Sequence, residues 1–237
     1  MKNKRKVLVT AGNTRVPIDR VRGIDNIFKG RTGARIARYF ALRGCDVTLL
    51  CSHPDTDLVD VFPHDAMKTI RFTTYDDLER EMEELIRGGT FDVVIHSAAV
   101  SDYCVDGMFE RIDPGSPNIP GHMIVTMKEL DRDGKISSNH SELWMKLVPT
   151  AKLIDKIRRD WGFKGTLVKF KLQVGMLDEK LVEIATSSMK QSGANFIVAN
   201  TLEGMTQRAY IISAKGGIPV MIGREELPAA LYQELGL

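Results

Sequence analysis

The chain has 237 residues, of which 43% are hydrophobic and 27% are charged, and its formal net charge is only +2. This composition is typical of a globular protein, and the small net charge argues against nucleic acid or an anionic membrane as a partner. The three cysteines lack CxxC spacing and the five histidines form no HExxH motif. These patterns argue against a disulfide framework and a protein metal site, and they favour the cytoplasm.

A strand–helix–strand unit is predicted within the first fifty residues. Residues 6–10 form a short aliphatic run that ends at Ala11-Gly12, as in a buried strand followed by a turn. Residues 32–43 have helical spacing of apolar side chains, and Gly44 is well placed as their C-cap. Residues 47–51 predict the next strand. The first apolar run is too short for a signal peptide or a membrane span.

The same alternation continues along the chain. It predicts further strands at residues 70–72, 91–97, 166–172 and 195–199, helices at 76–87 and 178–191, a hairpin at 209–213 and 219–222, and a last helix from residue 225. Residues 103 to about 140 show little periodicity and several prolines and glycines, which predicts an irregular flap. The whole pattern predicts a single domain over residues 1–237. Its expected fold is α/β, with a Rossmann-like open, mostly parallel sheet, helices on both faces, the flap and a C-terminal hairpin.

In an open parallel sheet, ligands bind beyond the carboxyl ends of the strands, so the turns after residues 10, 97 and 170 are the expected site. The first turn is not a GxGxxG fingerprint, because a long loop separates Gly12 from Gly30 and Gly33. Ordinary NAD binding is therefore disfavoured. The loop carries Arg15, Arg20, Arg22, Lys29 and Arg31, which suit either an anion-binding loop or a solvated basic surface.

Small residues follow the strand at 91–97. Ala98 and Ala99 would let a ring or a sugar approach, and Asp102 could bind a ribose or cap a turn. Lys135 on the flap could cover a phosphate or lie at the surface, and Phe170 could stack on a base or belong to the core.

Taken in order, several segments resemble the phosphopantothenoylcysteine synthetases, the ligase half of a bacterial coenzyme A flavoprotein and its free-standing relatives. VTAGNTR at 9–15 with PIDRVR at 17–22 is similar to the family's opening, TAGGTREPIDPVR. Asn26, Gly30 and Gly33 match its I-S/T-N and SSGKMG segments, and AAVSDY at 98–103 is close to its AAVADY. KISS at 135–138, FKL at 170–172 and VAN at 198–200 extend the resemblance to most of the chain.

The resemblance implies a two-step ligation. The carboxylate of 4′-phosphopantothenate would attack the α-phosphate of CTP or ATP, with Mg²⁺ present, and cysteine would then displace the nucleotide. It also implies a homodimer and a set of site residues. These are catalytic Asn26 and Lys135; nucleotide-binding Gly12, Ala98, Ala99, Asp102, Phe170 and Lys190; and substrate-binding Arg15, Arg22, Gly30 and Gly33.

The sequence also departs from the family. Residues 28–33 read FKGRTG in place of SSGKMG, and residues 185–189 lack the lysines of an ARKKL-like helix, leaving Lys190 nearby. Two alternatives follow. One is a nucleotide-binding relative without ligase activity, which the missing lysines would fit. The other is an NAD(P)- or flavin-dependent reductase on a similar fold, which the missing GxGxxG disfavours.

Overall fold

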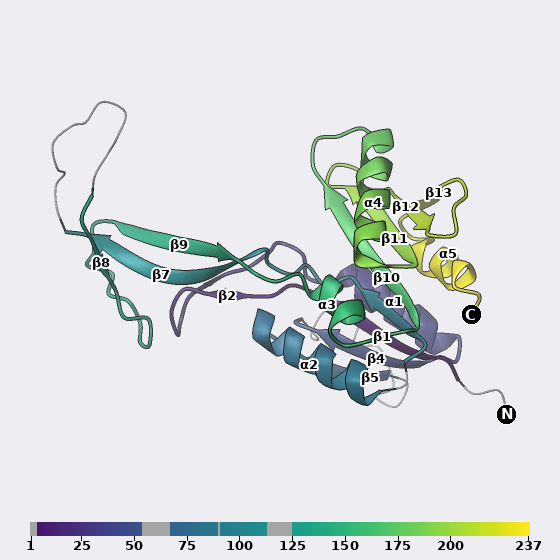
Figure 1. Cartoon of the computed structure of the whole chain (residues 1–237), viewed down its shortest axis with the longest axis horizontal. Helices are drawn as coiled ribbons and strands as arrows, with labels where there is room; N and C mark the ends of the chain where they lie inside the picture. Colours follow the sequence, from purple (N-terminus) through teal and green to yellow (C-terminus); the bar gives the residue numbers. More distant parts are fainter. Residues whose placement is uncertain (1–3, 54–66, 90, 113–124) are drawn as a thin grey trace.

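The computed structural model describes residues 4–53, 67–89, 91–112 and 125–237. Within them an eight-stranded sheet forms the body of the molecule, in the order β13-β12-β11-β10-β6-β1-β4-β5 (Figure 1). Its strands are β1 (Lys6–Ala11), β4 (Asp46–Cys51), β5 (Met67–Arg71), β6 (Val93–His96), β10 (Thr166–Gln173), β11 (Phe196–Thr201), β12 (Arg208–Ser213) and β13 (Val220–Gly223).

Six strands run parallel to one another, in the spatial order β5-β4-β1-β6-β10-β11, and β12 and β13 add an antiparallel hairpin at the β11 edge. Counting only the parallel strands along the chain, their spatial order is 3-2-1-4-5-6, the Rossmann order. The expected mostly parallel sheet and the C-terminal hairpin are thereby confirmed. Among the described residues no helix is both long and apolar enough to cross a membrane.

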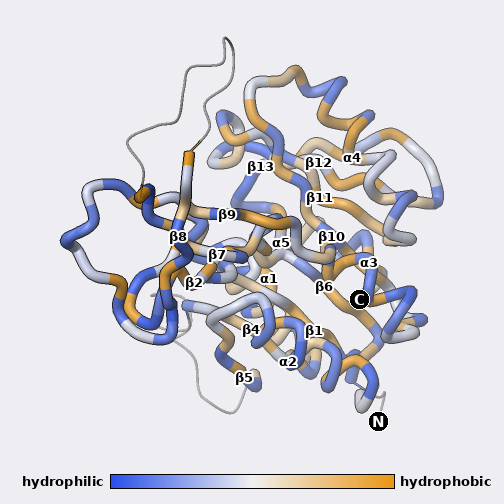
Figure 2. The backbone as a smooth tube through the Cα atoms, turned by 60° about the vertical axis from the view of Figure 1, so that its left-hand side comes forward, coloured by the Kyte–Doolittle hydropathy of each residue, from blue (hydrophilic) through white to orange (hydrophobic). Residues whose placement is uncertain are grey.

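Helices cover both faces of the sheet, as predicted. One face packs against α1 (Arg31–Leu42) and α5 (Leu227–Glu234), and the other against α2 (Tyr75–Gly88), α3 (Leu153–Arg159) and α4 (Asp178–Ser192). The central strands β1 and β6 are buried on both faces, so most of their side chains are hydrophobic (Figure 2). Helix α2 begins with a capping box in which Thr74 and Asp77 bond each other's backbone N–H groups.

A second, antiparallel sheet extends away from the body (Figure 1). It consists of β8 (Met127–Glu129), β7 (Tyr103–Arg111) and β9 (Leu143–Pro149), and we call it the arm. The short hairpin of β2 (Val16–Pro17) and β3 (Gly23–Ile24) packs against it. A small core of Val16, Val105, Met108 and Ile136 joins the hairpin to the arm.

The prediction of an irregular flap over residues 103–140 was wrong at residues 103–111 and 127–129, which form strands, while residues 130–140 are irregular as predicted. β7 is a nine-residue strand, and β8 pairs with it. The register shifts between Val105 and Gly107, so the alternation of buried and exposed residues is interrupted in mid-strand, and the sequence shows no clear period. Residues 113–124 of the predicted flap lie outside the described residues.

Candidate functional site

A cleft of about 1320 Å³ lies at the carboxyl ends of the parallel strands. It is lined by the turns after β1 and β6, by the carboxyl end of β10 and by the first turn of α1. β1 and β6 are the two strands between which the strand order reverses. This is the place where sheets of this kind bind their ligands, so the three predicted turns do meet in one cavity.

The floor of the cleft is a close contact between two glycines. Gly30 adopts φ +83°, and a Cβ added to it would lie 2.2 Å from the backbone nitrogen of Gly12. Gly12 itself has φ +91°, and its own added Cβ would lie 2.1 Å from the hydroxyl oxygen of Ser52. Both positions therefore require glycine for conformation and for space. The Gly12 turn is tied to the next strand end because Ala99 N–H donates to its carbonyl at 2.8 Å.

The first turn of α1 points its free backbone N–H groups at the cleft. Its N-cap is Gly30, which has no side chain to accept from them, and the first turn contains no acidic residue. Gly33 brings the helix close to β1, since an added Cβ would lie 2.4 Å from Ser97 Oγ and 2.8 Å from Ala11 Cβ. A helix end of this kind favours an anionic group.

Arg224 adds positive charge to the same wall. Its Nη2 donates to the hydroxyl of Thr32 in the first turn of α1, and its Nη1 is buried without a hydrogen-bond partner among the described residues. Burial lowers the pKa of Arg224, and the nearby Arg35 lowers it further. The C-terminal segment therefore contributes to the cleft, although the motifs gave no indication of it.

His96 lies beneath the cleft at the end of β6 and is uncharged at neutral pH. Burial, together with the charge of Lys169 on the neighbouring strand, lowers its pKa to about 4. Its Nδ1 hydrogen bonds to Thr10 Oγ1 at 2.9 Å, and the same hydroxyl accepts from Ala98 N–H at 3.1 Å. His96 thus fixes the turn that carries Ala98, in keeping with its expected role as a buried strand residue.

Asp102 and Phe170 both line the cleft. The carboxylate of Asp102 is 72% exposed and accepts from Lys152 Nζ at 3.1 Å. Phe170 lines the cleft and is partly buried against the core on the α1 side of the sheet. An exposed carboxylate and a ring at one opening suit the sugar and the base of a nucleotide.

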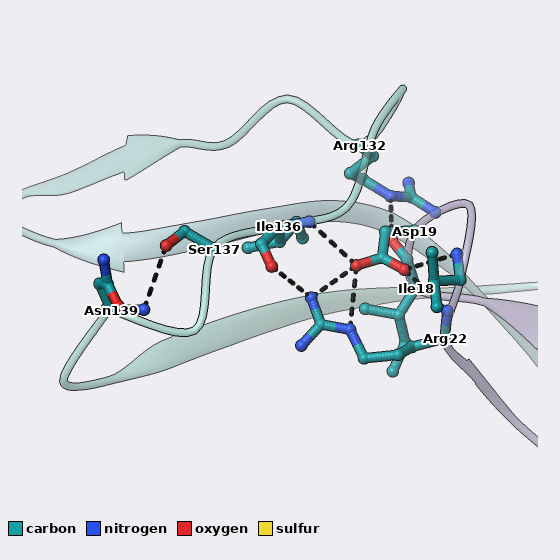
Figure 3. A network of polar contacts seen from close by, with 8 residues as sticks. Ile18, Asp19, Arg22, Arg132, Ile136, Ser137 and Asn139 are labelled. Atoms are coloured by element: carbon teal, nitrogen blue, oxygen red, sulfur yellow. Dashed lines mark hydrogen bonds and ion pairs between the residues drawn. The ribbon is translucent and has the colours of Figure 1, made fainter.

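Lys135 is held elsewhere, at the junction of the arm and the β2–β3 hairpin. The neighbouring Ile136 N–H donates to Asp19 Oδ2 at 3.1 Å, and Arg22 donates to Asp19 and to the Ile136 carbonyl (Figure 3). The Asp19 side chain is fully buried. Its pKa is held well below the usual range by Arg22 and by backbone N–H groups. Arg132 secures the junction by donating to the carbonyls of residues 17, 18 and 105.

The structure brings together eight of the twelve residues predicted for the site: Gly12, Asn26, Gly30, Gly33, Ala98, Ala99, Asp102 and Phe170 all line the cleft. The other four do not line it. Lys135 and Arg22 belong to the arm junction, and Arg15 forms an ion pair with Asp25 at 3.8 Å. Lys190 is exposed in the last turn of α4.

Magnesium fits this cleft only as a companion of bound phosphates. Asp102 and Asp155 line it, but no group of three or more His, Cys, Asp or Glu side chains in the described part of the chain could hold a metal ion. Mg²⁺ commonly takes one or two carboxylates and completes its shell with water and substrate phosphates.

Comparison with known proteins gives three matches of note. Residues 2–111 match the family model of the DNA/pantothenate metabolism flavoprotein C-terminal domain. The chain is 28% identical over 235 residues to the coenzyme A biosynthesis bifunctional protein CoaBC of Thermococcus kodakarensis, covering 98% of this chain and 49% of that protein. It is 23% identical over 256 residues to the phosphopantothenate–cysteine ligase of Homo sapiens, covering 94% and 81%.

Among solved structures, the DNA/pantothenate metabolism flavoprotein from Streptococcus pneumoniae matches with a TM-score of 0.79 and 29% identity, and the match covers 98% of each chain. The chain spans about half the length, or less, of the first curated relatives it matches.

Proposed function

Residues 2–111 match the family model of the DNA/pantothenate metabolism flavoprotein C-terminal domain, and from this match we propose that the chain is a phosphopantothenate–cysteine ligase of coenzyme A biosynthesis. Its substrates would be 4′-phosphopantothenate, cysteine and either CTP or ATP. The observation that carries the proposal is the single cleft in which the turns after β1, β6 and β10 meet the first turn of α1. The cytoplasmic location indicated by the cysteines stays a prediction.

The reaction has two steps. The carboxylate oxygen of phosphopantothenate attacks the α-phosphorus of the nucleotide and pyrophosphate leaves, which converts a poor acyl donor into a mixed anhydride. The amine of cysteine then attacks the acyl carbon, the nucleoside monophosphate leaves, and the amine loses a proton. Negative charge builds on phosphorus in the first step, so positive groups fixed in the cleft lower its barrier.

The residues suit these steps in the following way. Ala98 and Ala99 leave room for the sugar, Asp102 binds its hydroxyls and Phe170 contacts the base. The N–H groups at the start of α1 face the phosphates, and Asn26, which also lines the cleft, binds the acyl group. Mg²⁺ would neutralise part of the phosphate charge, with Asp102 or Asp155 able to hold it.

In this proposal Lys135 acts at the cleft of the other subunit of a homodimer. It lies on the arm, outside the cleft of its own chain, and the arm exposes an apolar surface that includes Trp144 (39%), Leu147 (46%) and Tyr103 (52%). Pairing two arms would cover this surface and carry Lys135 of the partner subunit toward the cleft. Arg22, which is bonded to the same segment, would move with it.

The activity assay measures pyrophosphate release and product formation from phosphopantothenate, cysteine, Mg²⁺ and CTP or ATP, with each component omitted in turn. Product is expected only from the complete mixture. Folded protein that gives no product with either nucleotide would refute the ligase. If nucleotide still raised its melting temperature, the chain would be a binding relative without ligase activity.

Mixing two inactive variants tests the dimer. Asn26→Asp and Lys135→Gln should each lose most activity. If the sites are shared, random exchange of subunits gives heterodimers with one intact site each, so about a quarter of all sites should recover. No recovery after confirmed exchange would place both residues in the same chain's site.

A further inference from the structure

Lys169 is a buried lysine in the wall of the cleft, on β10, and it has no carboxylate partner. The residue is 8% exposed, and it lines the cleft beside α4. Its ammonium donates to the Ser188 carbonyl at 3.1 Å, the Ser188 hydroxyl at 3.0 Å and the Ser192 hydroxyl at 3.2 Å. These acceptors are all neutral, and among the described residues no carboxylate lies within ion-pair distance of Lys169.

Charged groups of both signs surround Lys169, and no described carboxylate contacts its ammonium. Burial lowers its pKa, and Lys171 and Lys152 lower it further, while the carboxylate of Asp155 acts in the opposite direction. Lys171 lies two residues along the same strand and so points to the same face of the sheet. Lys152 is already paired with Asp102, and the neighbouring His96 is neutral.

A buried cation without a counterion costs stability, because neutral hydroxyls replace only part of its hydration. Such a group is compensated when an anion enters the cleft beside it. Helix α4 brings no basic side chain to this wall: its cleft-lining residues are Glu183, Ile184, Ser187, Ser188 and Gln191. The ammonium of Lys169 contacts this surface of α4. The positive charge at the α4 side of the cleft is therefore supplied by strand β10.

We propose that Lys169, with Lys171 beside it, holds the polyphosphate of the nucleoside triphosphate in this cleft. This assignment rests on the proposed function, and it explains how the site can work although residues 185–189 of α4 contain no lysine. The requirement is for positive charge at the α4 wall of the cleft, whichever element supplies it.

Lys169→Met removes the charge and keeps an unbranched side chain of similar length. Calorimetric titration with CTP and ATP should show triphosphate affinity about tenfold or more lower than in the wild type. Affinity for the corresponding monophosphate should change little, which also shows that the variant is folded. Lys171→Met, at a half-buried position, should give a smaller loss in the same direction. Lys164→Met removes the same charge from an exposed loop outside the cleft and serves as the control.

Moving the charge tests the role directly. In the double variant Lys169→Met with Ser188→Lys, a lysine on the helix reaches the position that the strand lysine occupied, and triphosphate affinity should recover. A purely structural Lys169 would not be rescued in this way. Equal losses of monophosphate and triphosphate affinity, or no recovery, would overturn the proposal.

Titration with 4′-phosphopantothenate tests whether Lys169 binds the phosphate of that substrate and not the triphosphate of the nucleotide. The affinity for 4′-phosphopantothenate should be unchanged in Lys169→Met; a selective loss there would move Lys169 to the other substrate and refute the assignment. These measurements need no turnover. A protein that binds triphosphate through Lys169 but forms no product refutes the ligase and leaves the assignment standing, whereas a wild type that binds neither nucleotide overturns both.

Discussion

Replacing Gly30 by alanine should destabilise the protein by about 2–5 kcal/mol, because two costs add at this position. The first is conformational: Gly30 has φ +83°, and a left-handed backbone costs an L-residue about 1–2 kcal/mol. The second is steric. The new methyl would lie 2.2 Å from the backbone nitrogen and 2.8 Å from the Cα of Gly12, and main-chain atoms cannot rotate away. Overpacking of this kind costs about 1–3 kcal/mol.

Gly44→Ala separates the two costs. Gly44 has φ +87°, but a Cβ added there would have no heavy atom within 4 Å, so only the conformational cost of about 1–2 kcal/mol applies. Both variants reduce the freedom of the unfolded chain equally, and this effect cancels in the comparison. The free energies of unfolding would be measured in urea. Gly30→Ala should be less stable than Gly44→Ala by the steric cost alone. Equal losses of unfolding free energy would refute the contact between Gly30 and Gly12.

Three further predictions concern the arm, the body and the cleft. Asp19 has a pKa lowered from 3.8, so its stabilising effect is complete above pH 3.8 and is lost as the pH falls below that value. The urea midpoint, followed by tryptophan fluorescence, should fall more steeply with acidification in the wild type than in Asp19→Asn. Thr74→Ala removes a helix cap and should cost about 1 kcal/mol of unfolding free energy, with no change in nucleotide affinity. Asp102→Asn breaks only an exposed ion pair, so stability should fall by less than about 1 kcal/mol, but calorimetry should show weaker binding of nucleoside monophosphate; unchanged affinity would remove Asp102 from the ribose site.

Most of the body could be predicted from the sequence because its elements are local and clearly bounded. Strands β1, β4, β6 and β11 are short, largely hydrophobic runs, and the boundaries of α1 and α2 coincide with Gly44 and the Gly88-Gly89 pair. The family resemblance predicted from the motifs was also confirmed by the comparisons. Most of these motifs lie in the turns that form the cleft, so eight of the twelve residues they indicate lie together there.

The arm and the helix α3 were missed for physical reasons. β9 is exposed or half-exposed along its whole length, so no alternation of polar and apolar residues marks it as a strand, and the bulge hides β7. α3 has only seven residues, which is too short for a helical period to stand out.

Lys169 could not be assigned to the site from the sequence either. A lysine in a strand normally indicates a solvent-exposed face. Here the side chain is buried because α4 lies over it and offers the hydroxyls of Ser188 and Ser192. The two serines lie 19 and 23 positions after Lys169 in the chain, so their contact with it forms only once the helix has packed onto the sheet.

The way in which the arm leaves the body has a consequence for engineering. Its two strands depart side by side: Thr150 N–H donates to the Asp102 carbonyl at 3.0 Å, and the Thr150 hydroxyl donates to the Ser101 carbonyl at 2.6 Å. Among the residues that the structure describes, none from the 103–149 range belongs to either large hydrophobic core of the body. A short turn joining residue 102 to residue 150 would therefore close on a pairing that already exists, and would yield a miniature of this protein that keeps the cleft-lining residues and lacks the exposed apolar surface of the arm.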